Sequence, residues 1–240
     1  MMVINRGTME QAMNDKQRAA NQAARLVEND MLVGLGTGST ANCFIEELAR
    51  LSKEDGLRIT TVASSVVSTI KARELGLPQM AIEQVNRLDL YVDGADEVTP
   101  NLTLLKGRGY DLVREKLLAE ASDKFLVLVD QSKLVDRIGE RFPVPVEVMP
   151  FAWQLVKARL ETSGARGELR QTPGKDGYVM TAYGSLVLDM VFDADTDSET
   201  LDDLLNSTPG IVEHGIFRGL TSAVFVAAEG QVEERWAVMD

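Results

Sequence analysis

Short apolar runs and amphipathic stretches alternate along the first 139 residues of the chain. The apolar runs, typical of buried strands, lie at residues 31–35, 58–64, 80–85, 88–93 and 124–130. Apolar positions with helical spacing lie at residues 9–29, 41–51, 68–75 and 110–121. Strands that alternate with helices favour a parallel sheet covered on both faces, so the pattern predicts an α/β fold with a Rossmann-like domain.

The pattern changes near residue 140, where Pro143, Pro145 and Pro150 punctuate a strand-like segment. Beyond it, helices are predicted at residues 151–163 and 197–207, and strands within residues 177–193 and 210–217. A strand–helix–strand–strand–helix–strand order suits a small α+β layer domain of the ferredoxin-like kind.

The C-terminal residues 221–240 have the pattern of a hairpin that returns to the larger sheet. We therefore predict that residues 1–139 and 219–240 form the larger, Rossmann-like domain. Residues 140–218 are predicted to form the smaller inserted domain.

Charge and rare residues narrow the possible functions. The chain of 240 residues has a net charge of −12, whereas nucleic-acid binding needs clustered Lys and Arg, so no nucleic-acid partner is expected. The single Cys43 excludes an intramolecular disulfide and a cysteine-based zinc site. The N-terminus lacks the apolar core of a signal peptide, and no apolar run could span a bilayer. We expect a cytoplasmic protein without a membrane partner.

The loop GLGTGST, residues 34–40, follows a predicted strand and opens a predicted helix. Backbone N–H groups and the helix dipole can receive an anion there. The loop lacks the third glycine of the dinucleotide fingerprint and the lysine of a P-loop. It reads either as a short phosphate cradle with hydroxyls from Thr37, Ser39 and Thr40, or as a tight turn capped by Ser39 or Thr40.

The turn DGADE gathers the carboxylates of Asp93, Asp96 and Glu97 behind a predicted strand. The turn has no regular spacing of oxygen ligands and no histidine nearby, so a metal site is disfavoured. An isolated acidic turn is usually a solvated loop. The DGADE turn and the GLGTGST loop, however, both follow predicted strands. Ligands of open α/β sheets bind at the carboxyl ends of strands, so the position of the turn favours a ligand site over a solvated loop.

Two further stretches carry possible chemistry. Lys106 precedes two glycines and a predicted helix, on which Val113, Leu117 and Ala121 form the apolar stripe and Glu115 projects away from it. This spacing favours a solvated Glu115 over a catalytic one. Lys133 follows a buried strand, a weak signal by itself.

Taken in order, these motifs resemble the A-type ribose-5-phosphate isomerase family. That family shows G-x-G-T-G-S-T, D-G-A-D-E, K-G-x-G leading into R-E-K, and D-x-S-K. Here they stand at residues 34–40, 93–97, 106–109 with 114–116, and 130–133. The resemblance covers most of the chain, most strongly residues 31–150.

The resemblance implies interconversion of D-ribose 5-phosphate and D-ribulose 5-phosphate in the pentose phosphate pathway, with no metal and no organic cofactor. It implies a homodimer or homotetramer whose partner is a small sugar phosphate. Glu115 would be the base that moves a proton between C1 and C2, with Asp93, Asp96 and Lys106 as further catalytic residues. The implied substrate-binding residues are Thr37, Gly38, Ser39, Thr40, Asp93, Gly94, Ala95, Asp96, Lys106, Gly107, Arg108, Gly109 and Lys133.

The sequence departs from the family pattern at a few positions. Arg108 replaces a frequent glycine and could crowd the site or contact phosphate, and Tyr110 and Asp111 replace small or apolar residues. Residues 64–69 keep only part of a hydroxyl-rich loop, and residues 182–189 replace an asparagine-rich turn. These changes leave room for a different sugar preference.

Two other classes of function compete with this reading. An amino-sugar phosphate isomerase or deaminase on a related fold should have a catalytic histidine, and His214 lies far along the chain. A non-catalytic sugar-phosphate sensor should carry a basic DNA-binding module, which the net charge of −12 disfavours.

Overall fold

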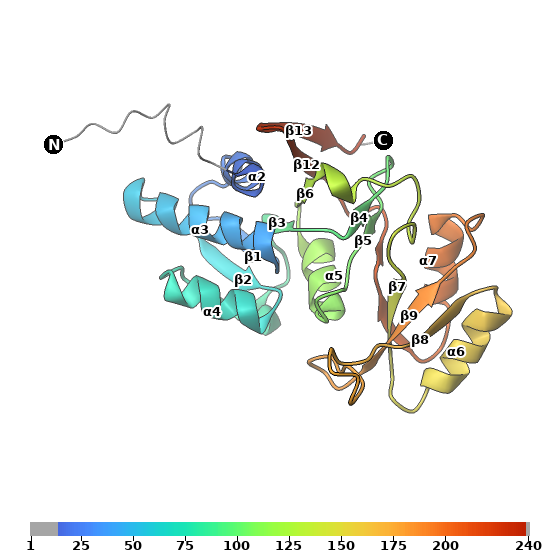
Figure 1. The fold of residues 1–240 in the computed structure, drawn as a ribbon. Helices are drawn as coiled ribbons and strands as arrows, with labels where there is room; N and C mark the ends of the chain where they lie inside the picture. The colour runs from blue at the N-terminus through green and yellow to red at the C-terminus, as the bar shows by residue number, and fades with distance from the viewer. Residues whose placement is uncertain (1–13, 239–240) are drawn as a thin grey trace. The chain divides into compact units, whose positions relative to one another are not determined.

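The structure, a computed structural model, describes residues 14–238, and these divide into two compact units. The first unit comprises residues 14–94, 122–132 and 223–238, and the second residues 95–121 and 133–222. Figure 1 shows the chain coloured from one end to the other. The domain boundaries given above, with an insertion at residues 140–218, stay a prediction.

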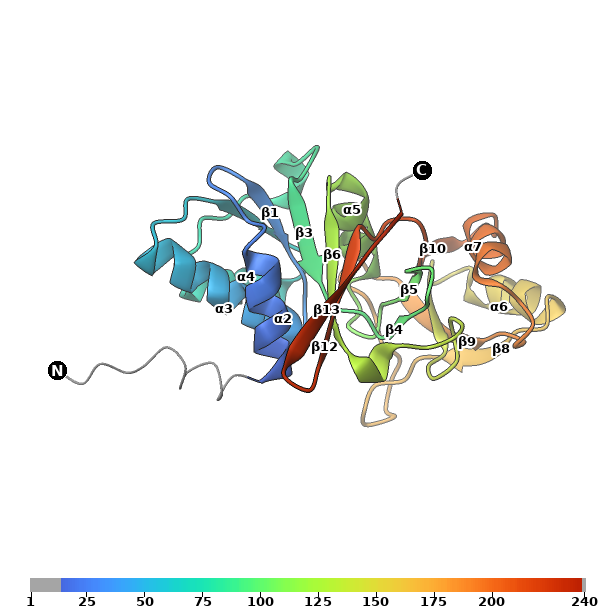
Figure 2. The same ribbon diagram turned by 90° about the horizontal axis from the view of Figure 1, so that it is seen from above.

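The first unit is built on a six-stranded sheet in the order β13-β12-β6-β3-β1-β2. All neighbours pair in parallel except β12 and β13, which form the C-terminal hairpin. Figure 2 shows β1, β3 and β6 side by side. The strands are β1 (Leu32–Leu35), β2 (Thr60–Ala63), β3 (Leu90–Asp93), β6 (Phe125–Asp130), β12 (Ala223–Ala228) and β13 (Gln231–Trp236). The predicted parallel sheet and returning hairpin are confirmed.

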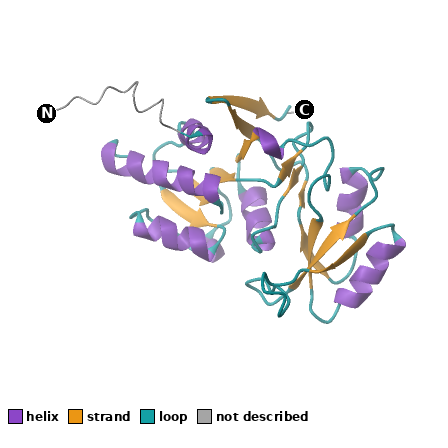
Figure 3. Cartoon of the chain, viewed as in Figure 1, coloured by secondary structure: helices purple, strands orange, loops and turns teal. Residues whose placement is uncertain are grey.

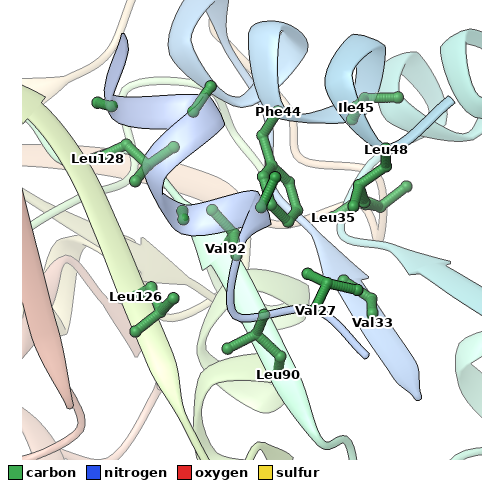
Figure 4. Close-up of a cluster of buried hydrophobic side chains, with 14 of the residues drawn as sticks. Val27, Val33, Leu35, Phe44, Ile45, Leu48, Leu90, Val92, Leu126 and Leu128 are labelled. Atoms are coloured by element: carbon green, nitrogen blue, oxygen red, sulfur yellow. The ribbon is translucent and has the colours of Figure 1, made fainter. Parts of the chain in front are cut away.

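The helices of the unit pack against apolar side chains of this sheet. Figure 4 shows Phe44, Ile45 and Leu48 packed over side chains from β1, β3 and β6. All of these side chains are almost completely excluded from solvent, which makes their burial the main stabilising term of the unit. The helices are α2 (Asp15–Ala24), α3 (Ser39–Glu54) and α4 (Val66–Glu74).

The predicted strand at residues 80–85 is wrong. This segment forms the single turn η1 (Ile82–Gln84), and most of its side chains are exposed, so it has no buried face that would favour sheet pairing. The predicted first helix reached back to residue 9, but residues 9–13 lie outside the described part of the chain. Among residues 14–238, none of the helices is long and apolar enough to cross a membrane.

The second unit contains a four-stranded antiparallel sheet in the order β10-β7-β9-β8. Its strands and helices, visible in Figure 3, alternate as predicted for a ferredoxin-like layer. They are β7 (Val144–Val148), α6 (Trp153–Thr162), β8 (Arg166–Leu169), β9 (Leu186–Val191), α7 (Ser198–Asn206) and β10 (Ile211–His214). The strands predicted within residues 177–193 are only partly right: β9 begins at Leu186, and β8 lies at residues 166–169, before the predicted range.

A small three-stranded sheet, β11-β5-β4, completes the second unit and holds the segment that precedes α5 (Leu112–Ala121). Its strands are β4 (Glu97–Val98), β5 (Leu104–Leu105) and β11 (Ile216–Phe217). The predicted strand at residues 210–217 is therefore two strands, parted at Gly215. A Cβ at Gly215 would lie 2.3 Å from the Lys106 carbonyl oxygen, so this close approach requires glycine.

Candidate active site

The loop after β1 lies at a reversal of strand order in the first unit. From β1 the sheet runs to β2 on one side and to β3 on the other, which is the place where open α/β sheets bind ligands. Gly36 is required here because a Cβ would lie 2.1 Å from Asp93 Oδ1. Gly38, with φ of 111°, is the N-cap of α3 and has no side chain to occupy the helix terminus. The alternative caps, Ser39 and Thr40, lie inside the helix, where their N–H groups belong to the anion-attracting first turn.

A cluster of buried hydroxyl groups surrounds Thr37. Its Oγ1 lies 2.6 Å from Ser65 Oγ, 3.1 Å from Ser68 Oγ and 3.2 Å from Ser64 Oγ. Ser68 Oγ also donates to the Gly36 carbonyl oxygen at 2.5 Å. The serines of residues 64–69, which stood out as a departure from the family pattern, therefore hold the loop. Their repeated hydroxyls were the only sequence signal for this.

Lys16 is a candidate that the sequence analysis missed. Its Nζ donates to Ser39 Oγ at 2.8 Å, which brings an exposed cation to the start of α3. The two residues are 23 positions apart, on different helices. The only sequence signal was a lysine in the first turn of the helix that precedes the loop.

Asp93 ends β3 and ties the loop to the sheet. Its Oδ1 accepts hydrogen bonds from the N–H groups of Thr37 at 3.0 Å and Gly94 at 2.8 Å, and its Oδ2 accepts from the Tyr91 hydroxyl at 2.6 Å. The side chain is fully buried. Asp93 is thus both a predicted catalytic residue and the anchor of the Thr37 loop.

We expect Asp93→Asn to lower the free energy of unfolding by about 2 kcal/mol, because an amide N–H₂ must replace one acceptor oxygen among three donors. Chemical denaturation of both proteins measures this. Asp89→Asn is the matched control, since Asp89 Oδ2 accepts a single backbone bond, from Leu32 at 2.7 Å. Equal losses for the two variants would contradict this account of Asp93.

In the second unit, Lys106 and Glu115 form a buried ion pair. Lys106 Nζ lies 3.3 Å from Glu115 Oε2, and the two side chains are 4% and 6% exposed. The sequence prediction for α5 was wrong: Leu117 is 56% exposed, and Glu115 lies on the buried face with Leu112 and Leu118. The interpretation of Glu115 as a solvated residue fails because Lys106, from the segment before the helix, offsets the cost of burying a carboxylate.

Phe217 lies close to two ammonium groups of this unit. Its ring centroid is 5.7 Å from Lys106 Nζ and 5.0 Å from Lys116 Nζ, distances suited to cation–π attraction. Lys116 Nζ is also 2.5 Å from Glu213 Oε1. Burial lowers the pKa of Lys116, and the Glu213 carboxylate opposes that shift.

Asp96 and its cationic neighbours form the second cluster of predicted site residues. Burial raises the pKa of Asp96, while the charges of Lys106, Arg108 and Lys133 and the Arg108 backbone N–H lower it. The Arg108 guanidinium is exposed and lies 4.2 Å from the Phe142 ring centroid, beside a cavity of about 290 Å³. Arg108 therefore packs on an aromatic face.

The remaining members of the predicted set follow from these positions. Gly94 and Ala95 are half-buried between Asp93 and Asp96, Gly109 is exposed, and Lys133 Nζ lies 5.9 Å from the Phe142 ring centroid. Gly107, with φ of 99°, has no room for a Cβ, which would lie 2.3 Å from a Leu112 methyl group.

Glu97, the third carboxylate of the DGADE turn, has a structural role. It is fully buried and accepts hydrogen bonds from the N–H groups of Gly139 and Arg141 at 2.7 Å and of Phe142 at 2.9 Å. His214 is likewise buried, and burial lowers its pKa to about 3, so its imidazole is neutral at physiological pH.

Comparison with known sequences identifies close relatives. The sequence model of the family described as ribose 5-phosphate isomerase A (phosphoriboisomerase A) matches residues 60–231. The ribose-5-phosphate isomerase A of Methanothermobacter thermautotrophicus is 44% identical over 216 residues, which cover 90% of this chain and 95% of that protein. That of Thermococcus kodakarensis is 42% identical over 212 residues, 88% and 93% of the two chains.

Solved structures agree with this similarity. Ribose 5-phosphate isomerase A from Methanocaldococcus jannaschii superposes with a TM-score of 0.87 and 35% identity, covering 92% of this chain and 98% of the other. A D-ribose-5-phosphate isomerase in complex with phospho-erythronic acid superposes with a TM-score of 0.89 and 39% identity, covering 93% and 100%. These similarities extend over both units of the chain.

Proposed function

We propose a residue-by-residue mechanism from the premise that this chain belongs to the ribose 5-phosphate isomerase A family. The chain is accordingly an aldose–ketose isomerase that interconverts D-ribose 5-phosphate and D-ribulose 5-phosphate. The observation that carries the mechanism is the buried pair of Lys106 and Glu115, a carboxylate and an ammonium 3.3 Å apart.

Glu115 is the proposed base. Its carboxylate takes the proton from C2 of the open-chain aldose, and the electrons of that C–H bond form the C1–C2 double bond while the aldehyde oxygen becomes an oxyanion. Glu115 then gives the proton back to C1, where the electrons of the C1–C2 double bond form the new C–H bond. At the same time O2 loses its proton and its electrons form the carbonyl at C2, while O1 is protonated. One base suffices because the two carbons are neighbours.

Lys106 is the proposed stabiliser of the enediolate oxygen. Its ammonium is almost completely removed from water, and a fixed charge in such an environment stabilises a developing oxyanion strongly. A related isomerase binds phospho-erythronic acid, whose carboxylate carries negative charge as an enediolate does. We assign Asp93 and Asp96 to proton exchange at O1, O2 and the ring oxygen, with Lys133 as a further substrate contact.

The phosphate group is assigned to the loop of residues 37–40. The first-turn N–H groups of α3 and the hydroxyls of Thr37, Ser39 and Thr40 are its proposed donors. Lys16, 2.8 Å from Ser39 Oγ, supplies the matching positive charge. Gly94, Ala95, Gly107, Arg108 and Gly109 are proposed as further substrate contacts.

We expect Lys16→Ala to raise the KM for ribose 5-phosphate about tenfold, the equivalent of one charge-assisted hydrogen bond, with kcat changed much less. Steady-state kinetics at constant ionic strength measure both constants. Lys53→Ala, at the opposite end of α3, is the charge-matched control and should behave as the native enzyme. A fall in kcat with unchanged KM would place Lys16 away from the phosphate.

The first assay of the reaction follows ribulose 5-phosphate formation from ribose 5-phosphate, without added metal and again with a chelator. The proposed mechanism uses only side chains and backbone groups of the chain, so turnover should be the same in both conditions. Loss of turnover with the chelator would contradict this mechanism. We further propose that the protein is cytoplasmic and that it forms a homodimer or a homotetramer. Sedimentation of the purified protein distinguishes the two oligomeric states.

A further inference from the structure

Arg170 forms a hydrogen bond with the residue that follows Lys106, although it takes no part in the chemistry assigned above. It follows β8 directly, and its Nη1 donates to the Gly107 carbonyl oxygen at 3.0 Å. Its Nε and Nη2 donate to the two carboxylate oxygens of Asp189, at 2.9 and 2.5 Å. The Arg170 side chain is 12% exposed, and the bidentate pair leaves the guanidinium little freedom to turn.

The hydrogen bond from Arg170 to Gly107 affects Asp96 through a single peptide group. The Gly107 carbonyl and the Arg108 N–H belong to the same planar peptide unit and point in opposite directions. The carbonyl accepts from Arg170, and the N–H is on the side of the Asp96 carboxylate, whose pKa it lowers. A guanidinium at the carbonyl end therefore fixes the direction of this N–H and also polarises it, which strengthens its attraction for the Asp96 carboxylate.

The segment that Arg170 contacts has an unfavourable backbone conformation at Tyr110. Gly107 has φ of 99° and Tyr110, a bulky residue, has φ of 71°, both in the left-handed region. The Tyr110 ring centroid lies 5.5 Å from the Arg170 guanidinium carbon. Arg170 thus contacts both ends of residues 107–110, the segment between Lys106 and the start of α5.

We propose that Arg170, fixed by Asp189, is a positioning residue for the isomerase reaction. It fixes the orientation of the peptide between Gly107 and Arg108 beside Asp96, and it keeps Lys106 directed at Glu115. The inference rests on the proposed function, because it gives the small antiparallel sheet a role in the chemistry assigned to Lys106 and Asp96. Arg170 itself contacts neither the reacting carbons nor the phosphate.

The test compares Arg170→Ala, Arg170→Lys and Asp189→Asn with the control Arg166→Ala, which removes an exposed arginine from β8, the strand that Arg170 follows. Misplacing catalytic groups by about 1 Å can cost 10²-fold, so Arg170→Ala should lower kcat about 10- to 100-fold. KM should change less than kcat, because the phosphate contacts assigned above are untouched and only the contacts proposed for residues 107–109 are displaced. Arg170→Lys and Asp189→Asn should give smaller losses, and Arg166→Ala none.

Chemical rescue and a pH profile separate positioning from a general loss of structure. Guanidinium at low, non-denaturing concentration should restore part of kcat to Arg170→Ala and leave the native enzyme unchanged. The acid limb of kcat/KM should move to higher pH in Arg170→Ala, because Asp96 then depends on Lys106, Arg108 and Lys133 alone to remain ionised.

The possible outcomes are distinct. An active native enzyme with an equally active Arg170→Ala variant overturns the inference. So does a fall in kcat that neither guanidinium nor Arg170→Lys reduces and that leaves the pH profile in place. If Arg170→Ala does not fold, Asp189→Asn and Arg170→Lys decide the matter by the same readouts. A folded native protein without turnover would instead overturn the proposed function.

Discussion

Replacing Glu115 by Gln should lower kcat on ribose 5-phosphate about 10³-fold, within the range of general-base contributions. Glutamine keeps the shape of the side chain and an oxygen for the Lys106 ammonium, but it cannot accept the C2 proton. KM should change little, because Glu115 is not among the proposed phosphate contacts. The measurement is the initial rate of ketose formation, together with exchange of the C2 hydrogen for deuterium from the solvent.

The matched control is Glu120→Gln, which removes an exposed carboxylate from the same helix. It should leave both constants as in the native enzyme and so exclude an effect of the net charge of α5. Substantial C2–H exchange in a folded Glu115→Gln variant would assign the base to another residue. The reaction itself would then stand without this choice of base.

Replacing Lys106 by Met should destabilise the protein by about 3 kcal/mol, because it leaves the Glu115 carboxylate buried without its ammonium partner 3.3 Å away. The same change should lower kcat about 10²- to 10³-fold through loss of oxyanion stabilisation. Urea unfolding gives the first quantity, and steady-state kinetics of the folded fraction give the second.

The double variant Lys106→Met with Glu115→Leu shows whether the ion pair is the cause. Removing both charges should recover most of the lost stability, since apolar side chains often replace a buried ion pair without cost. Activity should stay absent. Additive losses in the double variant would mean that the two residues are not coupled, against the geometry of the pair.

The sequence determined the class of fold and the positions of most elements. The alternation of apolar runs with helical spacing identifies every strand of the parallel sheet, since period and turn residues are local properties. The prediction from this pattern was wrong at residues 80–85, where an apolar run has no buried face. It was also wrong for α5, where the apolar stripe was assigned to the exposed side of the helix. Burial depends on what packs against a segment, which local spacing does not contain.

The sequence also marked the segments of the candidate site, because glycine loops and the clustered carboxylates of Asp93, Asp96 and Glu97 are recognisable by their order along the chain. Which side chains do what was decided by tertiary structure. Glu97 turns inward to hold three backbone N–H groups, and the serines of residues 64–69 gather around Thr37.

Tertiary structure alone decided the contacts between residues distant in sequence. Lys16 reaches Ser39 across 23 positions, and Arg170 reaches Gly107 across 63. Neither arginine nor lysine at an isolated position signals such a partner, because long cationic side chains occur over most protein surfaces. What the fold adds is the direction of each side chain and its removal from water, and those two properties turn an ordinary carboxylate such as Glu115 into a candidate base.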